Sequence, residues 1–168
     1  MFFYKKENAF SIIELMITMA IIGVVSAVSI PGFKQWSRNY NLQSAAIDLY
    51  SHMQMAKLGA VKENRLWNIN FNPGGILGYE VRSSAQPPPA KPAKIVKFGE
   101  KYAGEILFAD PTASKTYDAP TLSFNASGLS DKGYAYISNK SRSKYYRVGL
   151  PFSTGSIRIE KWNGIKWE

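Results

Sequence analysis

The sequence predicts an α+β protein in which one long N-terminal helix packs on an antiparallel, β-rich head. Residues 10–30 form a nearly uninterrupted apolar run, and apolar residues then recur every three or four positions to about residue 61. Beyond residue 65, short segments alternate apolar and polar side chains, as half-buried strands do. A chain of 168 residues has room for one such head after an N-terminal segment is set aside.

The apolar run is long enough to cross a membrane. Its only charged residue is Glu14, and at about 1.5 Å per residue a helix over residues 10–30 spans a hydrocarbon core of roughly 30 Å. Lys5 and Lys6 precede it, which by the positive-inside rule keeps the N-terminus in the cytoplasm and sends the head across. We therefore expect residues 10–31 to be a membrane-spanning helix.

Glu14 needs an explanation of its own. An ionisable side chain costs about 2.5–3.5 kcal/mol at the centre of a membrane helix and less near its end, so it usually has a partner. A plain signal anchor accounts for the hydrophobic run but gives no reason for the carboxylate. A charge that merely decorates the membrane surface is the remaining alternative.

The stretch "KKENAFSIIELMITMAIIGVVSAVSIPGF" resembles the class III signal of type IV prepilins and type II secretion pseudopilins. A short basic leader is followed by the small residue Ala9, where glycine is usual, by Phe10, and by a carboxylate four residues later. The resemblance implies that residues 1–9 are a leader removed by a prepilin peptidase between Ala9 and Phe10, and that the new amine of Phe10 is methylated. It also implies that Glu14 serves assembly, lying beside the amine of Phe10 on a neighbouring subunit.

Gly23 and Pro31 bracket the second half of the apolar run. Pro31 removes the backbone N–H that would bond the carbonyl of Ala27, so we expect a kink or a locally melted turn there. The two positions resemble the helix-weakening residues of pilins. A kink that a membrane helix simply tolerates explains them equally well.

Residues 32–65 are predicted to continue the helix amphipathically into the head. The following apolar or small residues share one face: Phe33, Trp36, Tyr40, Leu42, Ala46, Leu49, Met53, Ala56 and Ala60. The opposite face is predicted to be solvated and carries Lys34, Arg38, Asp48, Lys57, Lys62 and Glu63. His52 has no second histidine and no cysteine beside it, so we interpret it as an ordinary helix residue.

Residues 66–168 are predicted to form the β-rich head. The strand segments are "RLWNINFN", "GYEVRSS", "KIVKFG", "EILFAD", "TLSFNASG", "GYAYISN", "YYRVGLPF" and "SIRIEKW". Two longer joins, "SSAQPPPAKPAK" and "DPTASKTYDAP", are predicted loops. Near the end, Asn163 and Gly164 predict a type I′ hairpin turn that packs Trp162 across from Trp167.

Two further stretches narrow the resemblance to the GspH/FimT (FimU) family of minor pseudopilins. "QMAKLGAVKENRLWNIN" is similar to the family's helix end and first strand, and "LPFSTGSIRIEKW" to its closing strand. The resemblance implies a structural, assembly-initiating subunit of a type IV pilus or a type II secretion pseudopilus. Such a subunit is held in the bacterial inner membrane with its head in the periplasm, and its partners are other minor subunits and the major subunit.

DNA is the alternative partner. The formal net charge of +9 favours an anionic ligand, and "NKSRSKYYR" mixes basic residues with Tyr145 and Tyr146. FimT-type proteins are associated with DNA capture through a G-R-x-R motif, where this chain has Gly155, Ser156, Ile157 and Arg158. The candidate phosphate contacts are Lys140, Arg142, Lys144, Arg147 and Arg158. A solubilising hairpin edge is the simpler explanation of the same cluster.

An enzyme is the weakest alternative. The chain has no cysteine, one histidine and no nucleotide-binding loop, so we expect neither catalysis nor a cofactor. Asp110, Asp118 and Asp131 lie in predicted loops without the spacing of a calcium site, so we expect no metal.

Overall fold

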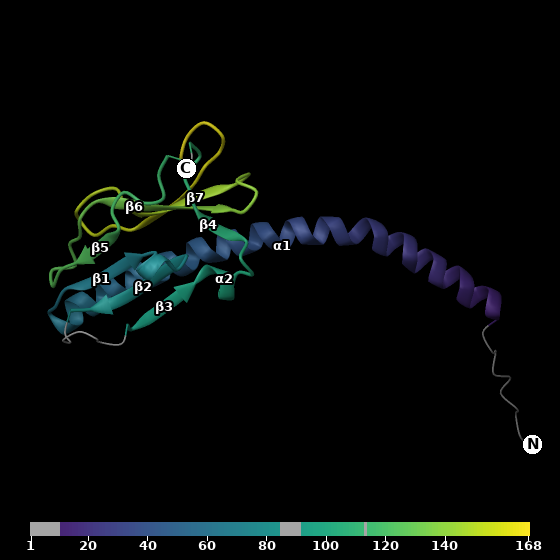
Figure 1. Ribbon diagram of the computed structural model, residues 1–168, viewed down its shortest axis with the longest axis horizontal. Helices are drawn as coiled ribbons and strands as arrows, with labels where there is room; N and C mark the ends of the chain where they lie inside the picture. Colours follow the sequence, from purple (N-terminus) through teal and green to yellow (C-terminus); the bar gives the residue numbers. More distant parts are fainter. Residues whose placement is uncertain (1–10, 85–91, 113) are drawn as a thin grey trace, which may run out of the picture. The chain divides into compact units, whose positions relative to one another are not determined.

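The computed structural model describes residues 11–84, 92–112 and 114–168, and it has the predicted α+β fold (Figure 1). In the described part of the chain, the helix α1 (Ile12–Glu63) is followed by eight strands and two short helical turns. The chain divides into two compact units, Met1–Ser37 and Arg38–Glu168. The predicted leader, including Ala9, and Phe10 lie outside the described residues, as does most of the proline-rich loop.

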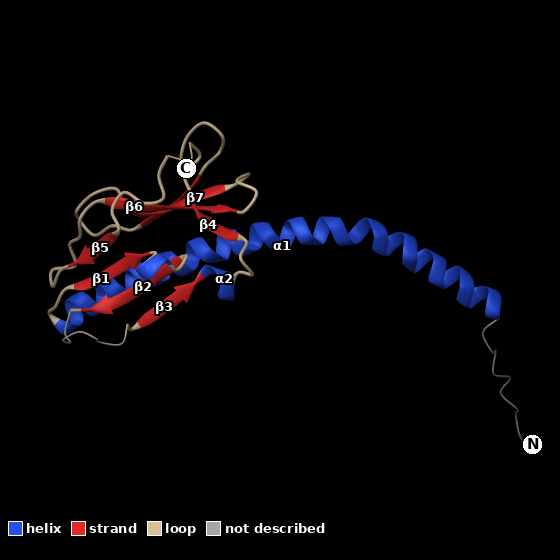
Figure 2. Ribbon diagram, in the orientation of Figure 1, coloured by secondary structure: helices blue, strands red, loops and turns tan. Residues whose placement is uncertain are grey.

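The second unit holds two antiparallel sheets of four strands each (Figure 2). The first has the order β3-β2-β1-β5, formed by β1 (Trp67–Phe71), β2 (Gly78–Ser83), β3 (Lys94–Lys97) and β5 (Thr121–Phe124). The second has the order β4-β6-β7-β8, formed by β4 (Ile106–Phe108), β6 (Gly133–Asn139), β7 (Tyr145–Leu150) and β8 (Arg158–Lys161). Each predicted strand segment contains one of these strands, and the alternation of a half-buried strand is clearest in β1, β4 and β5.

The core of this unit lies between α1 and the inner faces of the sheets. Its helix residues are fully or almost fully buried and include small side chains, which let the strands approach the helix closely: Leu42, Ala45, Ala46, Leu49, Met53, Ala56 and Ala60. From the strands, Ile69, Val81 and Phe124 pack into the same cluster as Ile137 and Val148. One continuous core therefore holds both sheets against α1.

The predicted apolar face of α1 is not buried at its N-terminal end. Phe33, Trp36 and Tyr40 follow the helical period but are 60–66% exposed, and burial begins at Leu42. Two residues of the predicted solvated face are only half-exposed: Asp48 bonds Lys101 of α2 (Phe98–Lys101), and Lys57 reaches the carbonyl of Gly155. Lys34 on that face has no described side chain.

Two local expectations also differ from the structure. The end of the "KIVKFG" segment turns into α2, because Phe98 is drawn into the core and forms ring contacts with Tyr79 and Phe108. The Trp162–Trp167 pair is present, but its turn is not type I′, since Gly164 has a positive φ and Asn163 does not. Instead the Asn163 side chain accepts hydrogen bonds from the backbone N–H groups of Ile165 and Lys166.

Candidate functional site

Glu14 lies in the first turn of α1 and is exposed. Its backbone N–H donates to the carbonyl of Ser11, so the backbone at Glu14 is part of the first helical turn. The neighbours Ile13 and Leu15 are 67% and 53% exposed. Within the described residues, no cation forms an ion pair with Glu14. Among the described residues, Glu14 is thus a carboxylate without an ion-pair partner on an apolar helix end.

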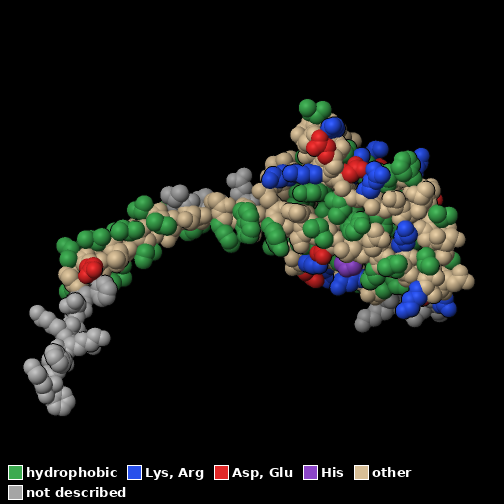
Figure 3. Space-filling view, turned by 180° about the vertical axis from the view of Figure 1, so that it is seen from behind, with side chains coloured by type: hydrophobic (Ala, Val, Ile, Leu, Met, Phe, Trp, Pro, Cys, Tyr) green, Lys and Arg blue, Asp and Glu red, His purple; other side chains and the backbone are tan. Residues whose placement is uncertain are grey.

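Apolar side chains are exposed along residues 12–30 of α1, in the first unit (Figure 3). The exposed set is Ile12, Ile13, Leu15, Met16, Ile17, Met19, Ile21, Ile22, Val24, Val25 and Ile30. Exposed apolar surface of this extent marks a contact with lipid or with another protein. Searched over the described residues, none of the helices meets the length and hydropathy required of a membrane span. The predicted membrane crossing of residues 10–31 stays a prediction.

The helix α1 runs through Gly23 and Pro31 without a break. The expected melted turn is therefore absent from this structure. A methyl group placed on Gly23 would meet no atom within 4 Å, so packing among the described residues does not require glycine there. Whether these positions weaken the helix in an assembly stays a prediction.

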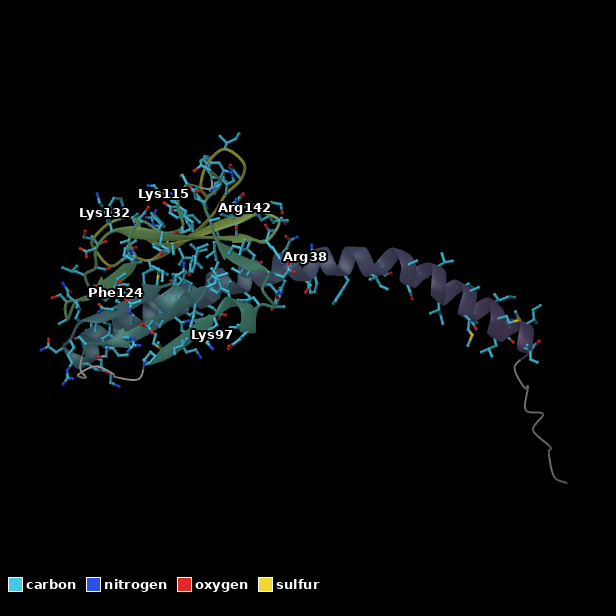
Figure 4. All side chains as sticks on the ribbon, in the orientation of Figure 1. Arg38, Lys97, Lys115, Phe124, Lys132 and Arg142 are labelled. Carbon is cyan, nitrogen blue, oxygen red and sulfur yellow. The ribbon has the colours of Figure 1, made fainter. Side chains whose placement is uncertain are left out.

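The basic cluster forms the hairpin between β6 and β7. Asn139 organises the loop, because its side-chain oxygen accepts from the N–H groups of Ser143 and Lys144, at 2.8 and 3.2 Å. Arg142 occupies a left-handed conformation at the tip (Figure 4). Lys140, Arg142 and Lys144 are all exposed. We call these three residues the basic tip.

The side chain of Arg147 is held by neighbouring residues. The five predicted phosphate contacts therefore do not form one free surface. Its guanidinium pairs with the carboxylate of Glu160 on β8, and Nε donates at 2.7 Å. The same group lies over the rings of Tyr134 and Trp167, 4.3 and 4.8 Å from their centroids. Arg158 is exposed on β8, across from Gly149. Arg147 is close to the basic tip in the sequence, but its partners lie in β6, in β8 and in the C-terminal tail.

The two tyrosines beside the basic tip do not form a stacking platform. Tyr145 is half-buried and its hydroxyl donates to the carbonyl of Arg142, at 2.7 Å. Tyr146 packs against the core, and burial raises the pKa of its hydroxyl. Both rings therefore serve the fold of the hairpin.

Gly155 belongs to the stretch compared with G-R-x-R, and the structure gives it a packing role. Its φ is +72°, and an added Cβ would lie 2.1 Å from the carbonyl oxygen of Gly128. Its own carbonyl accepts from the Lys57 ammonium at 2.9 Å. Gly155 thus fixes the loop before β8 against α1.

The sequence interpretation missed a polar network between α1 and the first sheet. His52 Nδ1 lies 2.7 Å from the hydroxyl of the buried Tyr79, and His52 is an ordinary structural residue, as expected. One turn earlier, Asp48 accepts from Tyr102 and from Lys101. Burial would raise the pKa of Asp48, but these hydrogen bonds outweigh it and the net pKa is lowered.

Acidification is expected to destabilise the head through His52. Burial lowers the pKa of His52 below its ordinary value, so beneath about pH 6.5 the unfolded chain binds the proton more readily than the folded one. Stability is therefore retained above that pH and falls as the pH decreases. We expect His52→Gln to flatten the dependence of Tm on pH between pH 7.5 and 5.5. Parallel curves for the two proteins would contradict this role.

The described residues contain no cluster of three acidic or histidine side chains that suits a metal ion. Asp110 instead closes its own loop, accepting from Thr112, Ser114 and Lys115. Asp118 accepts from the N–H of Tyr134 and from the hydroxyl of Tyr136.

Comparison with known proteins agrees with the motif and the fold. Residues 4–30 match the family model of the prokaryotic N-terminal methylation motif. The structure is similar to the type IV minor pilin FimU of Pseudomonas aeruginosa in two crystal forms. One has 18% identity and a TM-score of 0.56, over 79% of this chain and 96% of FimU. The other has 19% identity and a TM-score of 0.54, over 76% and 97%.

A third structure, the minor pseudopilin EpsH of the type 2 secretion system of Vibrio cholerae, aligns with 13% identity and a TM-score of 0.49, over 71% of this chain and 95% of EpsH. No curated protein matches the sequence. At these identities the FimU comparison shows the fold, and the methylation motif is matched independently at the N-terminus.

Proposed function

We propose that this chain, which is type IV pilin-like in its N-terminal motif and its fold, is a non-enzymatic minor pilin or pseudopilin. Its role is to help initiate and build a pilus or a secretion pseudopilus. The observation that carries the proposal is the coincidence of the methylation motif over residues 4–30 with a helix whose apolar side chains are exposed among the described residues. In a filament, the same helices of neighbouring subunits would cover that surface.

Before assembly, the proposed location is the inner membrane, with the head in the periplasm. The lysines before the apolar run support this orientation, and the exposed side chains of the helix suit lipid. The proposed partners are a prepilin peptidase, other minor subunits and the major subunit. Within this scheme Ala9 and Phe10 form the processing site, and Glu14 is the residue that sets axial register.

Co-expression with a prepilin peptidase tests the processing step. We expect the full chain to lose residues 1–9, and a catalytically inactive peptidase to leave it intact. Glu14→Gln serves as a second substrate that should still be cut, because the proposed role of Glu14 follows cleavage. An intact chain in the presence of active peptidase would contradict the proposal.

DNA binding is the second candidate function, and the basic tip is the observation in its favour. Lys140, Arg142 and Lys144 are exposed together, and no ion pair neutralises them among the residues that the structure describes. Three phosphate contacts predict weak binding with little sequence preference and a salt slope of about −3. The pairing of Arg147 with Glu160 weakens this candidate, because it removes a charge from the predicted set.

A salt titration with labelled duplex DNA is expected to show this modest slope. Replacing Lys140, Arg142 and Lys144 together by glutamine should abolish the complex with little change in Tm, since exposed charges contribute little to folding. Replacing Lys62, Lys94 and Lys132 together by glutamine removes the same number of charges at exposed positions outside the hairpin, and this variant is the charge-matched control. Absence of a complex at about 50 mM salt, where electrostatic binding is favoured, would reject DNA binding.

A further inference from the structure

We propose that the outer edge of β8 is a docking site for an extended segment of a protein partner, which adds to the second sheet as a strand. The segment would place apolar side chains beside Ile157 and Ile159 and an acidic side chain beside Arg158. Strand addition of this kind needs neither a processed N-terminus nor a filament. It can therefore be tested separately from the proposed function.

The strand order places β8 at an edge, and the hydrogen bonds show which of its groups face outward. The N–H of Trp162, just after β8, donates to the carbonyl of Tyr145 on the β7 side, at 3.1 Å. In an antiparallel pair, alternate residues point their backbone groups to the same side. Glu160 and Arg158 therefore bond toward β7, whereas Lys161, Ile159 and Ile157 direct their N–H and C=O groups away from it.

The C-terminal tail already pairs with Lys161, one of these three outward-facing residues. Lys161 and Glu168 exchange two backbone hydrogen bonds, at 2.6 and 2.9 Å, and Trp162 pairs with Trp167. The tail thus runs antiparallel along the outside of β8 as far as Lys161. The next outward-facing residue along β8 is Ile159. A strand that continues the direction of the tail would pair with it.

A groove follows the same edge. Tyr50 of α1 lines it together with residues 157–160 and the tail residues Trp167 and Glu168. Ile157 is buried and Ile159 half-buried, so their side chains face the core, and Arg158 points to the opposite, exposed face. A strand in the groove would meet an apolar surface on one face and a cation on the other.

The charges along the edge favour an acidic segment. Glu160 is already paired with Arg147. Arg158 forms no ion pair with any side chain that the structure describes, and it is exposed. An acidic residue directly opposite Arg158 would form a favourable cross-strand pair, and a basic residue there would be repelled. Recognition then combines backbone pairing with alternate side-chain contacts, as in other strand-addition complexes.

A tethered segment gives the sharpest test. The full chain, purified in detergent, is extended after Glu168 by Thr-Val-Glu-Val, which places its two valines opposite Ile159 and Ile157 and its glutamate opposite Arg158. Hydrogen exchange of the Ile159 amide is then compared with that of the unextended chain. We expect the extension to slow exchange by about tenfold or more and to raise Tm.

Three matched variants complete the design. Thr-Val-Lys-Val should protect Ile159 less, and Gly-Pro-Gly-Pro should not protect it. Ile159→Pro removes the outward N–H together with the isoleucine side chain, so its own effect on Tm is measured first in the unextended chain. In this variant the extension should give no gain in Tm. Unchanged exchange with Thr-Val-Glu-Val would overturn the docking site, and equal protection by the lysine form would overturn the acidic partner. Concentration-dependent protection of the unextended chain would assign the edge to a second copy and also overturn the proposal.

Discussion

Replacing Glu14 by valine is expected to remove the chain from filaments while its head stays folded and its N-terminal helix still enters the membrane. Removing a charge from an apolar helix makes insertion easier, so lost assembly could not be attributed to the bilayer. In the proposed filament, the variant would leave the amine of Phe10 on a neighbour without its partner. Breaking a buried ion pair on one side costs about 3–5 kcal/mol, which is enough to reduce incorporation by more than tenfold.

Thr18→Val is the matched control for this experiment. Thr18 lies one turn further along the same exposed helix, and its hydroxyl donates to the carbonyl of Leu15. Both variants add a valine to the same segment, but only one removes the charge. Subunits in sheared filament fractions are compared with those left in the membrane. Equal incorporation of Glu14→Val and the native chain would contradict the pairing.

Gly155→Ala is expected to destabilise the head by about 2–5 kcal/mol. The left-handed φ of +72° is unfavourable for alanine, and its Cβ would lie 2.1 Å from the carbonyl oxygen of Gly128. That oxygen belongs to the backbone, so the loop itself has to move. The movement would also disturb the hydrogen bond from Lys57 to the carbonyl of Gly155, at 2.9 Å.

Gly164→Ala separates the two causes. Gly164 also has a positive φ, of +104°, but an added Cβ would meet no atom within 4 Å. Its substitution carries the conformational cost alone, so it should lower stability much less than Gly155→Ala. Urea denaturation of the two variants and the native chain measures the difference. Similar losses in both variants would show that close packing at Gly155 is not what requires glycine.

The fold was largely predictable from the sequence because several strands of the head, β1, β4 and β5 among them, alternate buried and partly exposed residues. Alternation of side chains reports that situation directly, as in "WNINF", whose burial alternates along β1. The start of the core on α1 was not predictable in this way. Phe33, Trp36 and Tyr40 follow the same period as Leu42, but where the head begins to cover the helix depends on strands far along the chain.

The candidate sites show the same limit. Local spacing was sufficient to place Glu14 on an apolar helix and Lys140, Arg142 and Lys144 on a hairpin. It could not show that Arg147 is held by Glu160, Tyr134 and Trp167, because those partners are 13 to 20 positions away. Nor could it find the pairing of His52 with Tyr79, which joins a helix to a strand.

The N-terminus of the mature protein tests the central claim most directly. The chain would be isolated from membranes of a host with a prepilin peptidase, and its N-terminal peptide analysed by mass spectrometry and sequencing. The account predicts a chain that begins at Phe10 and carries one methyl group on its α-amine, with Glu14 as its fifth residue. A chain that still begins at Met1, or one that begins beyond Ile30, would contradict assembly as a pilin-like subunit.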